Sequence, residues 1–386
     1  MFSDRTSWPL LPNRLHRLAR QRRAQGDFCD LTISNPTICG FHYPANLLAA
    51  LAAPAALRYE PQPFGLATAR AAVVDYYRER GLELRERRVA LTASTSEAYC
   101  HLFRLLCNPG DAVLAPAPSY PLLDLLAGLE NVTVRAVPML YDHGWQLDVD
   151  TLAAAETGVR ALFLVHPNNP AGNYIKPPEW LKLQELAAAR GWAIVVDEVF
   201  FDYPMDSAVA LQFDHCPALT FLLNGCSKIS ALPQMKLGWI AGFGPETLAA
   251  PAWERLEMVL DLFLSVSAPA QQAAPALLGA RHALQPQIRE RLRTNLTALD
   301  AALAGHPAVE RLRMEGGWTA LLRLPRILSD EAWAERLVES SGVLTHPGHF
   351  YGLPQEACLA LSLLPPAANF DRGLARLARG IAAEME

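Results

Sequence analysis

The stretch from residue 161 to residue 198 reads ALFLVHPNNPAGNYIKPPEWLKLQELAAARGWAIVVDE. It begins with a short apolar run, Ala161–Val165, and ends with a second one, Trp192–Val196. Between them, Pro178–Arg190 has the spacing of an amphipathic helix, and Gly191 is a typical residue to end it. Two buried strands joined by a helix form the repeating unit of a parallel α/β sheet.

The same alternation continues on both sides of this unit. Further short apolar runs predict strands at Val89–Thr92, Ala112–Ala115, Leu219–Leu223 and Trp239–Phe243, with a helix at Glu97–Cys107. This order of elements is typical of a doubly wound α/β domain.

The pattern changes after about residue 270. Longer helical patterns are expected at Ala270–Leu303 and Asp330–Ser340, with strands near Trp318–Leu324 and Leu359–Leu363. We interpret this region as a smaller α+β domain, onto which the segment before Asn46 packs. The predicted division is a large domain over residues 46–270 and a small domain over residues 1–45 and 271–386.

The overall composition is that of an ordinary soluble globular protein. The net formal charge of the 386 residues is -5, which gives no reason to expect nucleic acid or a membrane as a partner. No apolar run approaches the ~20 residues of a membrane helix, and the N-terminus lacks the pattern of a signal peptide. The seven cysteines are scattered, which favours reduced thiols in a cytoplasmic protein over a zinc site or disulfides.

Polar side chains follow three of the predicted strands, at the edge where α/β sheets bind ligands. One strand leads into a turn that contains Asn169, the next into Asp197, and a third into Lys228. Only four of the 34 basic residues are lysine, so few side chains can supply a primary amine. At a fourth strand end, the small residues Ala93–Ser96 lead into a helix, and their backbone N–H groups and hydroxyls can bind an anion. The sequence therefore predicts an amine, a carboxylate and an anion site in one crevice.

With these features, the sequence resembles fold-type I enzymes that depend on pyridoxal 5′-phosphate (PLP). It is most similar to the class I and II aminotransferases of the aspartate aminotransferase superfamily, over nearly its whole length. The resemblance depends on the order and spacing of short motifs, which are Tyr59–Gly65, Leu91–Ala98, Asn108–Asp111, Pro118–Tyr120, Asn168–Gly172, Asp197–Phe200, Ser227–Lys228, Lys236–Gly238 and Pro347–Phe350. It implies a PLP-transferase-like α/β fold, in which a large domain with a mostly parallel seven-stranded sheet between helices adjoins a smaller α+β domain.

The resemblance also implies roles for the residues around the cofactor ring. Lys228 would form a Schiff base with PLP and then carry the substrate's α-proton as general base and acid. Asp197 would keep the pyridine nitrogen protonated, although Glu198 beside it is a second candidate carboxylate. Asn169 would hydrogen-bond the 3′-oxygen and Tyr120 would stack on the ring. Both also fit plain structural roles, as a turn asparagine and a half-buried tyrosine.

The resemblance implies that the phosphate of the cofactor is bound by the hydroxyls of Ser94, Thr95 and Ser96 and by the cation of Lys236. It also implies that Ser227 is a cofactor-binding residue. Lys236 stands where the family usually has arginine, so a point charge replaces a bidentate fork. The hydroxyl cluster also fits an ordinary helix N-cap. Tyr59 matches a tyrosine that reaches the phosphate of the neighbouring subunit, which implies a homodimer with composite sites.

Three positions depart from the family pattern. Phe200 replaces a tyrosine that supports the 3′-oxygen. Gly225 replaces a serine three positions before the lysine, for which Ser227 or Asn224 could substitute. Ala360 stands where an arginine normally clamps the substrate's α-carboxylate, so the main charge-assisted contact to an amino acid is missing.

The loss of this arginine leaves two interpretations of substrate binding. Either another arginine takes its place, with Arg323 and Arg58 as candidates, or the substrate is not a standard α-amino acid. His349 is a further candidate substrate contact, and a structural loop histidine is an equal alternative.

The function implied by the resemblance is transfer of an amino group from an amino donor to a 2-oxo acid. The alternative is a PLP-dependent lyase, decarboxylase, racemase or synthase, because these reactions use the same Schiff base. A PLP-binding sensor module and a non-catalytic descendant are disfavoured, since no DNA-binding segment is apparent and both Lys228 and Asp197 are retained. No metal site is predicted.

Overall fold

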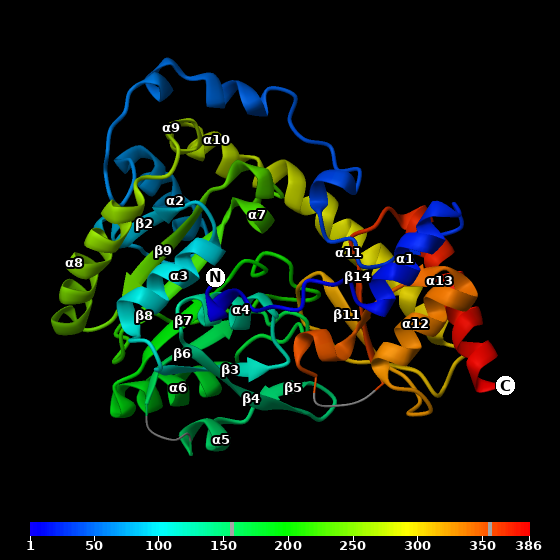
Figure 1. Cartoon of the computed structure of the whole chain (residues 1–386). Coiled ribbons are helices and arrows are strands. Elements are labelled where there is room, and N and C mark those ends of the chain that lie inside the picture. Colours follow the sequence, from blue (N-terminus) through cyan, green and yellow to red (C-terminus); the bar gives the residue numbers. More distant parts are fainter. Residues whose placement is uncertain (155–157, 354–356) are drawn as a thin grey trace.

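The computed structural model describes residues 1–154, 158–353 and 357–386. Within this part of the chain the strands form an eight-stranded sheet, a four-stranded sheet and a two-stranded pair. The large sheet lies in one half of the molecule, and the two small sheets lie with the C-terminal helices in the other half (Figure 1). The molecule therefore has two layered parts that meet along one side.

The large sheet contains the strands predicted from the sequence. Its order is β2 (Val89–Thr92), β9 (Gly238–Phe243), β8 (Thr220–Gly225), β7 (Ala193–Asp197), β6 (Val159–Val165), β3 (Ala112–Ala117), β4 (Thr133–Tyr141) and β5 (Trp145–Leu147). The neighbours from β8 to β4 are parallel, and β9 runs antiparallel to both β2 and β8. The predicted mostly parallel seven-stranded sheet is confirmed, and β5 adds a short antiparallel eighth strand at one edge.

Helices cover both faces of the large sheet, because successive residues of a strand point to opposite faces. Phe163 packs in one apolar cluster and Leu164 packs in the other. The Phe163 face is covered by α3 (Thr95–Leu106), α4 (Leu122–Leu129) and α8 (Glu246–Phe263), and the Leu164 face by α2 (Ala67–Glu79) and α6 (Pro177–Arg190). The near-continuous apolar runs in the sequence follow from this burial on both faces.

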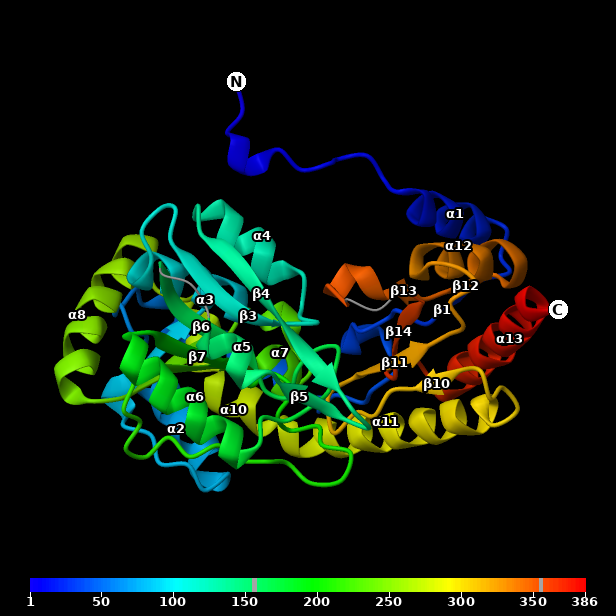
Figure 2. The same cartoon turned by 90° about the horizontal axis from the view of Figure 1, so that it is seen from below.

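The second part contains a four-stranded antiparallel sheet. Its order is β10 (Glu310–Arg311), β11 (Thr319–Arg323), β14 (Cys358–Ser362) and β13 (His346–Pro347). Helices α1 (Arg14–Ala24), α12 (Asp330–Ser341) and α13 (Ala367–Met385) pack beside it, as Figure 2 also shows. Near the N-terminus, β1 (Cys29–Asp30) pairs with β12 (Val343–Leu344). This pairing supports our proposal that residues 1–45 and 271–386 form the small domain and residues 46–270 the large one.

The prediction of one long helix over Ala270–Leu303 is wrong, because the helix is interrupted. The structure has three helices there, which are α9 (Ala268–Gln272), α10 (Ala274–Gly279) and α11 (Arg281–Leu303). Pro275 lies in the first turn of α10, where a missing N–H is tolerated and a new helix can begin. No helix among the described residues is long and apolar enough to cross a lipid bilayer.

Candidate active site

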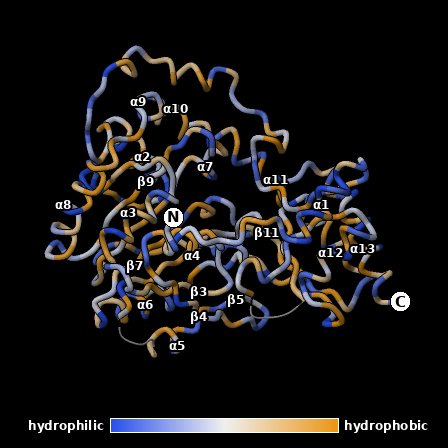
Figure 3. The backbone as a smooth tube through the Cα atoms, viewed as in Figure 1, coloured by the Kyte–Doolittle hydropathy of each residue, from blue (hydrophilic) through white to orange (hydrophobic). Residues whose placement is uncertain are grey.

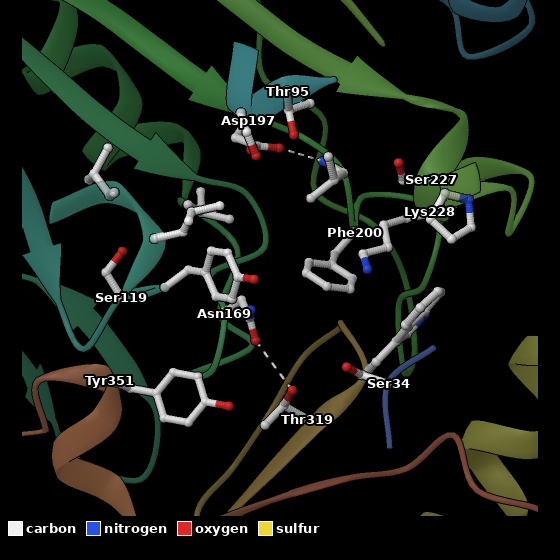
Figure 4. A pocket seen from close by; sticks show the side chains of 18 of the residues that line it. Ser34, Thr95, Ser119, Asn169, Asp197, Phe200, Ser227, Lys228, Thr319 and Tyr351 are labelled. Atoms are coloured by element: carbon white, nitrogen blue, oxygen red, sulfur yellow. Dashed lines mark hydrogen bonds between the residues drawn. The ribbon is translucent and has the colours of Figure 1, made fainter. Parts of the chain in front are cut away.

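A pocket of about 540 Å³ lies between the carboxyl ends of the large sheet's strands and the four-stranded sheet. Figure 4 shows the side chains that point into it. Its lining includes every predicted cofactor residue except Tyr59, namely Ser94, Thr95, Ser96, Tyr120, Asn169, Asp197, Ser227, Lys228 and Lys236. The fold therefore gathers into one pocket residues that lie between positions 94 and 236 of the sequence.

Lys228 and Asp197 lie at the ends of neighbouring strands. Asp197 is the last residue of β7, and Lys228 belongs to the short helix α7 (Cys226–Ile229) that follows β8. Burial lowers the pKa of Lys228, while the nearby Asp197 charge opposes this effect. The Lys228 Nζ lies 5.6 Å from the centre of the Phe200 ring and 5.1 Å from that of the Trp318 ring. An amine in such apolar surroundings is biased toward its neutral, nucleophilic form.

Asp197 is a buried carboxylate with two hydrogen-bond donors. The Val199 N–H donates to its Oδ1 at 2.9 Å, and the Tyr99 hydroxyl donates to its Oδ2 at 2.8 Å. Burial raises the pKa of Asp197 to about 6, and these two bonds act against that rise. A cationic group bound next to Asp197 would lower this pKa. Tyr99 was not predicted as a site residue, since a tyrosine within a helix carries no recognisable signal in one sequence.

Glu198, the alternative carboxylate, lies on the other side of the strand end. It forms an ion pair with Arg80 at 2.8 Å, and its side chain is only 1% exposed. The Arg80 guanidinium in turn lies over the Phe201 ring, 3.6 Å from its centre. Asp197 is the only acidic residue among the described residues that line the pocket. The structure thus separates the two adjacent acids into one pocket group and one structural group.

The N-terminus of α3, which the sequence predicts to be an anion site, lines the pocket. Ser94 caps this helix by accepting a hydrogen bond from the Glu97 N–H at 3.1 Å. Thr95 and the residue after it open the helix, where backbone N–H groups have no helical partner. Strand β9 passes very close, since a Cβ on Gly238 would lie 3.0 Å from the Ser94 carbonyl carbon. This close approach positions Lys236, two residues before Gly238, on the same wall of the pocket.

The ring-binding candidates lie nearer the four-stranded sheet. Asn169 lines the pocket and its Oδ1 accepts a hydrogen bond from the Thr319 hydroxyl at 3.2 Å (Figure 4). Tyr120 also lines the pocket and its side chain is about half-exposed. Phe200 meets the Trp318 ring edge to face, with ring centres 5.4 Å apart. At the position where the family usually has a tyrosine hydroxyl, this chain therefore has the Phe200 ring, which packs against Trp318.

The structure gives a physical reason for Gly225. A Cβ at this position would lie 2.9 Å from the Leu237 carbonyl oxygen and 3.0 Å from the Gly238 Cα, so a serine does not fit. Asn224 is fully buried and bonds the Glu198 carbonyl and the Gly225 N–H. Of the two substitutes considered for the missing serine, Ser227 lines the pocket and Asn224 does not.

The candidate substitutes for the missing arginine do not line this pocket. Arg323 forms an ion pair with Glu310, and Arg58 is an exposed residue paired with Glu60. His349 does not line the pocket. Its backbone N–H donates to the Asp330 carboxylate at 2.6 Å, and its ring Nδ1 lies 3.2 Å from the same carboxylate oxygen. The lining residues that sequence reasoning missed include six from the proposed small domain, which are Thr32, Ser34, Trp318, Thr319, His346 and Tyr351.

Tyr59 does not reach the pocket of its own chain. Its side chain is 71% exposed, and it borders a separate shallow hollow together with Arg58 and Gln271. A contribution of Tyr59 to a binding site therefore requires a second copy of the chain.

The residues of the pocket fit PLP. A buried amine suits its aldehyde, a buried carboxylate suits a protonated pyridine nitrogen, and a helix N-terminus next to a lysine suits its phosphate. The absence of a side chain at Gly238 leaves room for the backbone of β9 against the start of α3. Asp197, whose burial is costly without a cationic partner, is the observation that most specifically favours such a ring.

The fold and pocket define a PLP-type α/β protein, and comparisons with known proteins agree. Residues 42–377 match the family model described as aminotransferase class I and II, and the chain belongs to this family. The cofactor of this family is PLP. Glutamate–pyruvate aminotransferase AlaA of Escherichia coli is 30% identical over 257 residues, which cover 64% of this chain and 63% of that protein. Arginine–pyruvate transaminase AruH of Pseudomonas aeruginosa is 28% identical, with 78% and 76% covered.

Solved structures show the same fold. Alanine aminotransferase from Pyrococcus furiosus superimposes with a TM-score of 0.89 at 21% identity, covering 99% of this chain and 100% of that one. Aspartate aminotransferase from Thermus thermophilus, crystallised with maleate, gives a TM-score of 0.85 at 24% identity, covering 98% and 99%. The alignment with the Escherichia coli relative spans less than two thirds of that protein's length.

Proposed function

We propose that this chain is a PLP-dependent aminotransferase, which moves an amino group from an amino donor to a 2-oxo acid. The observation that carries the proposal is that Lys228 and Asp197 lie at the ends of adjacent strands and line the same pocket. That pocket is also lined by the N-terminus of α3. Membership of the class I and II aminotransferase family supports the same activity.

In this proposal each pocket residue has a defined task. Lys228 would bind the cofactor covalently. The Asp197 carboxylate would hydrogen-bond the pyridine nitrogen and keep that nitrogen protonated. Asn169 binds the 3′-oxygen and Tyr120 covers the ring. Ser94, Thr95 and Ser96 at the start of α3 and Lys236, just before β9, would hold the phosphate, with Ser227 of α7 as a further cofactor-binding residue.

When bound, PLP supplies an electron sink for negative charge on the amine-bearing carbon of the substrate. Asp197 maintains that capacity, because an ionised carboxylate stabilises a cationic ring. The Lys228 amine removes the proton of that carbon and returns a proton during transfer, a role that requires its neutral form. Burial of Lys228 favours this form, and the Phe200 and Trp318 rings place apolar surface beside its Nζ.

We further propose a homodimer in which Tyr59 reaches the phosphate site of the partner subunit. Three observations support it: Tyr59 is 71% exposed, it does not line the pocket of its own chain, and it lies two residues after Leu57, which is 93% exposed. We also propose a cytoplasmic location, which the free and mostly buried thiols support.

The test is a titration of the PLP-loaded protein with amino donors in the absence of any acceptor. Transfer predicts that the absorbance band of the aldehyde form of the cofactor is replaced by that of its amine form, and that a 2-oxo acid restores the first band. A lyase, decarboxylase, racemase or synthase would instead turn over the donor while the band of the aldehyde form persists. That second result would contradict the proposed function.

A further inference from the structure

The side of the pocket formed by the small domain is built around Ala360. This residue lies in the middle of β14, where it pairs with Leu321 of β11 and with His346 of β13. Ala360 and His346 both line the pocket. His346 is therefore the neighbour of the position at which the family usually carries its carboxylate-binding arginine.

Among the described residues of one chain, the pocket lining contains no arginine that could bind a substrate carboxylate. Among the described residues that line it, the lysine and arginine side chains are those of Lys228 and Lys236. The proposed function commits both of them to the cofactor. Arg323 and Arg58 form ion pairs elsewhere.

What the pocket offers instead is a pair of neutral hydrogen-bonding groups. The His346 Nδ1 lies 3.0 Å from the Tyr351 hydroxyl oxygen, and both side chains line the pocket (Figure 4 shows Tyr351). Burial lowers the pKa of His346 and raises the pKa of Tyr351 to about 12. The imidazole is therefore neutral and the phenol protonated at neutral pH, so the pair can donate or accept a hydrogen bond without adding charge.

The rest of this wall is also uncharged. Trp318 provides aromatic surface, which Phe200 of the large domain extends by contacting it, and Ser34 and Thr319 provide hydroxyls. Moving a carboxylate from water into such a site without a cationic partner is strongly unfavourable, whereas a hydroxyl or an amide loses little if it finds a hydrogen bond.

We propose that the amino substrate carries an uncharged hydrogen-bonding group, such as a hydroxyl or an amide, instead of a carboxylate on its amine-bearing carbon, and that His346 and Tyr351 recognise this group. The inference rests on the proposed function and names the substrate class of the same pocket. The preference is one of affinity, so an abundant 2-oxo acid still serves as acceptor at a higher concentration.

The experiment compares two amines that differ only in this group. L-Phenylalaninol and L-phenylalanine are mixed in turn with the PLP-loaded enzyme without acceptor, and the rate of change of the cofactor band is measured against amine concentration. We expect the second-order rate constant to be at least about tenfold larger for the amino alcohol. An equal or larger constant for the amino acid would overturn the inference. If neither these two compounds nor any other amine converts the band, the proposed function itself has failed.

Two variants assign the preference to this wall. Tyr351→Phe should lower the rate constant for L-phenylalaninol about fivefold or more and leave that for 2-phenylethylamine, which has no polar group there, unchanged. Ala360→Arg should reverse the preference between the amino acid and the amino alcohol. Equal losses for both amines in Tyr351→Phe would count against a recognition role for the pair.

A binding measurement gives a readout other than turnover. The unreactive analogues 3-phenylpropan-1-ol and 3-phenylpropanoate can be titrated into the loaded enzyme while the fluorescence of tryptophan, including Trp318 in the pocket wall, is followed. Tighter binding of the alcohol is expected, and tighter binding of the carboxylate would contradict the inference.

Discussion

Replacing Asp197 by asparagine tests how much the buried charge at the centre of the pocket costs the cofactor-free protein. Burial raises the pKa of Asp197 from the ordinary 3.8 to about 6. Because the folded chain holds this proton more tightly than the unfolded chain, stability falls as pH rises from about 4 to about 6 and remains lower above that range. The pKa of Asp197 differs by about two units between the folded and the unfolded chain, and each unit is worth about 1.4 kcal/mol. Ionisation of Asp197 therefore lowers the unfolding free energy by roughly 3 kcal/mol at pH 8.

Asp197→Asn removes this ionisation but also weakens two hydrogen bonds. An amide oxygen accepts the Tyr99 and Val199 bonds less strongly than a carboxylate, which costs about 1 kcal/mol. We therefore expect the cofactor-free variant to be more stable than the wild type by about 2 kcal/mol at pH 8, and to have no advantage near pH 4, where the wild-type carboxyl is protonated.

The assay is urea unfolding of both proteins without PLP at the two pH values. The control is Asp206→Asn, which changes an exposed acid outside the pocket and should shift neither curve. A variant that is less stable than the wild type at pH 8, or one whose advantage does not shrink at low pH, would refute the reasoning.

Three further predictions concern the supports of the pocket. Tyr99→Phe removes a bond that holds the pKa of Asp197 down, so the fall in the pH profile of the cofactor-free protein's unfolding free energy should end about one pH unit higher. An unchanged profile would contradict this role. Gly238→Ala forces β9 away from the start of α3 and should weaken PLP binding at least tenfold in equilibrium dialysis. Gly279→Ala is the matched control, since a Cβ there meets nothing within 4 Å. Glu198→Gln leaves a buried guanidinium without its charge partner and should lower the unfolding free energy by roughly 3 kcal/mol, with PLP uptake retained; loss of uptake without loss of stability would argue against the structural role.

The central sheet could be predicted from sequence because its strands are buried on both faces. Each therefore appears as a short, continuous apolar run, as Ala161–Val165 does. Strand β4 lacks this signal, since residues at the edge of the sheet alternate between buried and exposed. Its pairing with β3 depends on contacts that a linear pattern does not contain.

Some pocket residues could likewise be predicted from the local sequence, whereas others depend on contacts between distant parts of the chain. Lys228 and Asp197 were predictable, because a polar side chain directly after a buried strand has a fixed place at the sheet edge. Tyr99 lies within a helix, and its reach to Asp197 depends on how α3 packs. His346 was missed in favour of His349, because only the pairing of β13 with β14 shows which histidine faces the pocket.

The most direct test of the account is to identify the residue that holds PLP. The purified protein is incubated with PLP, reduced with borohydride, digested and examined by mass spectrometry. We predict that the mass of the reduced cofactor is found on the peptide containing Lys228, that Lys228→Ala abolishes it, and that Lys182→Ala, at an exposed lysine of α6, does not. A protein that takes up no cofactor mass, or that carries it on another lysine, would contradict the account.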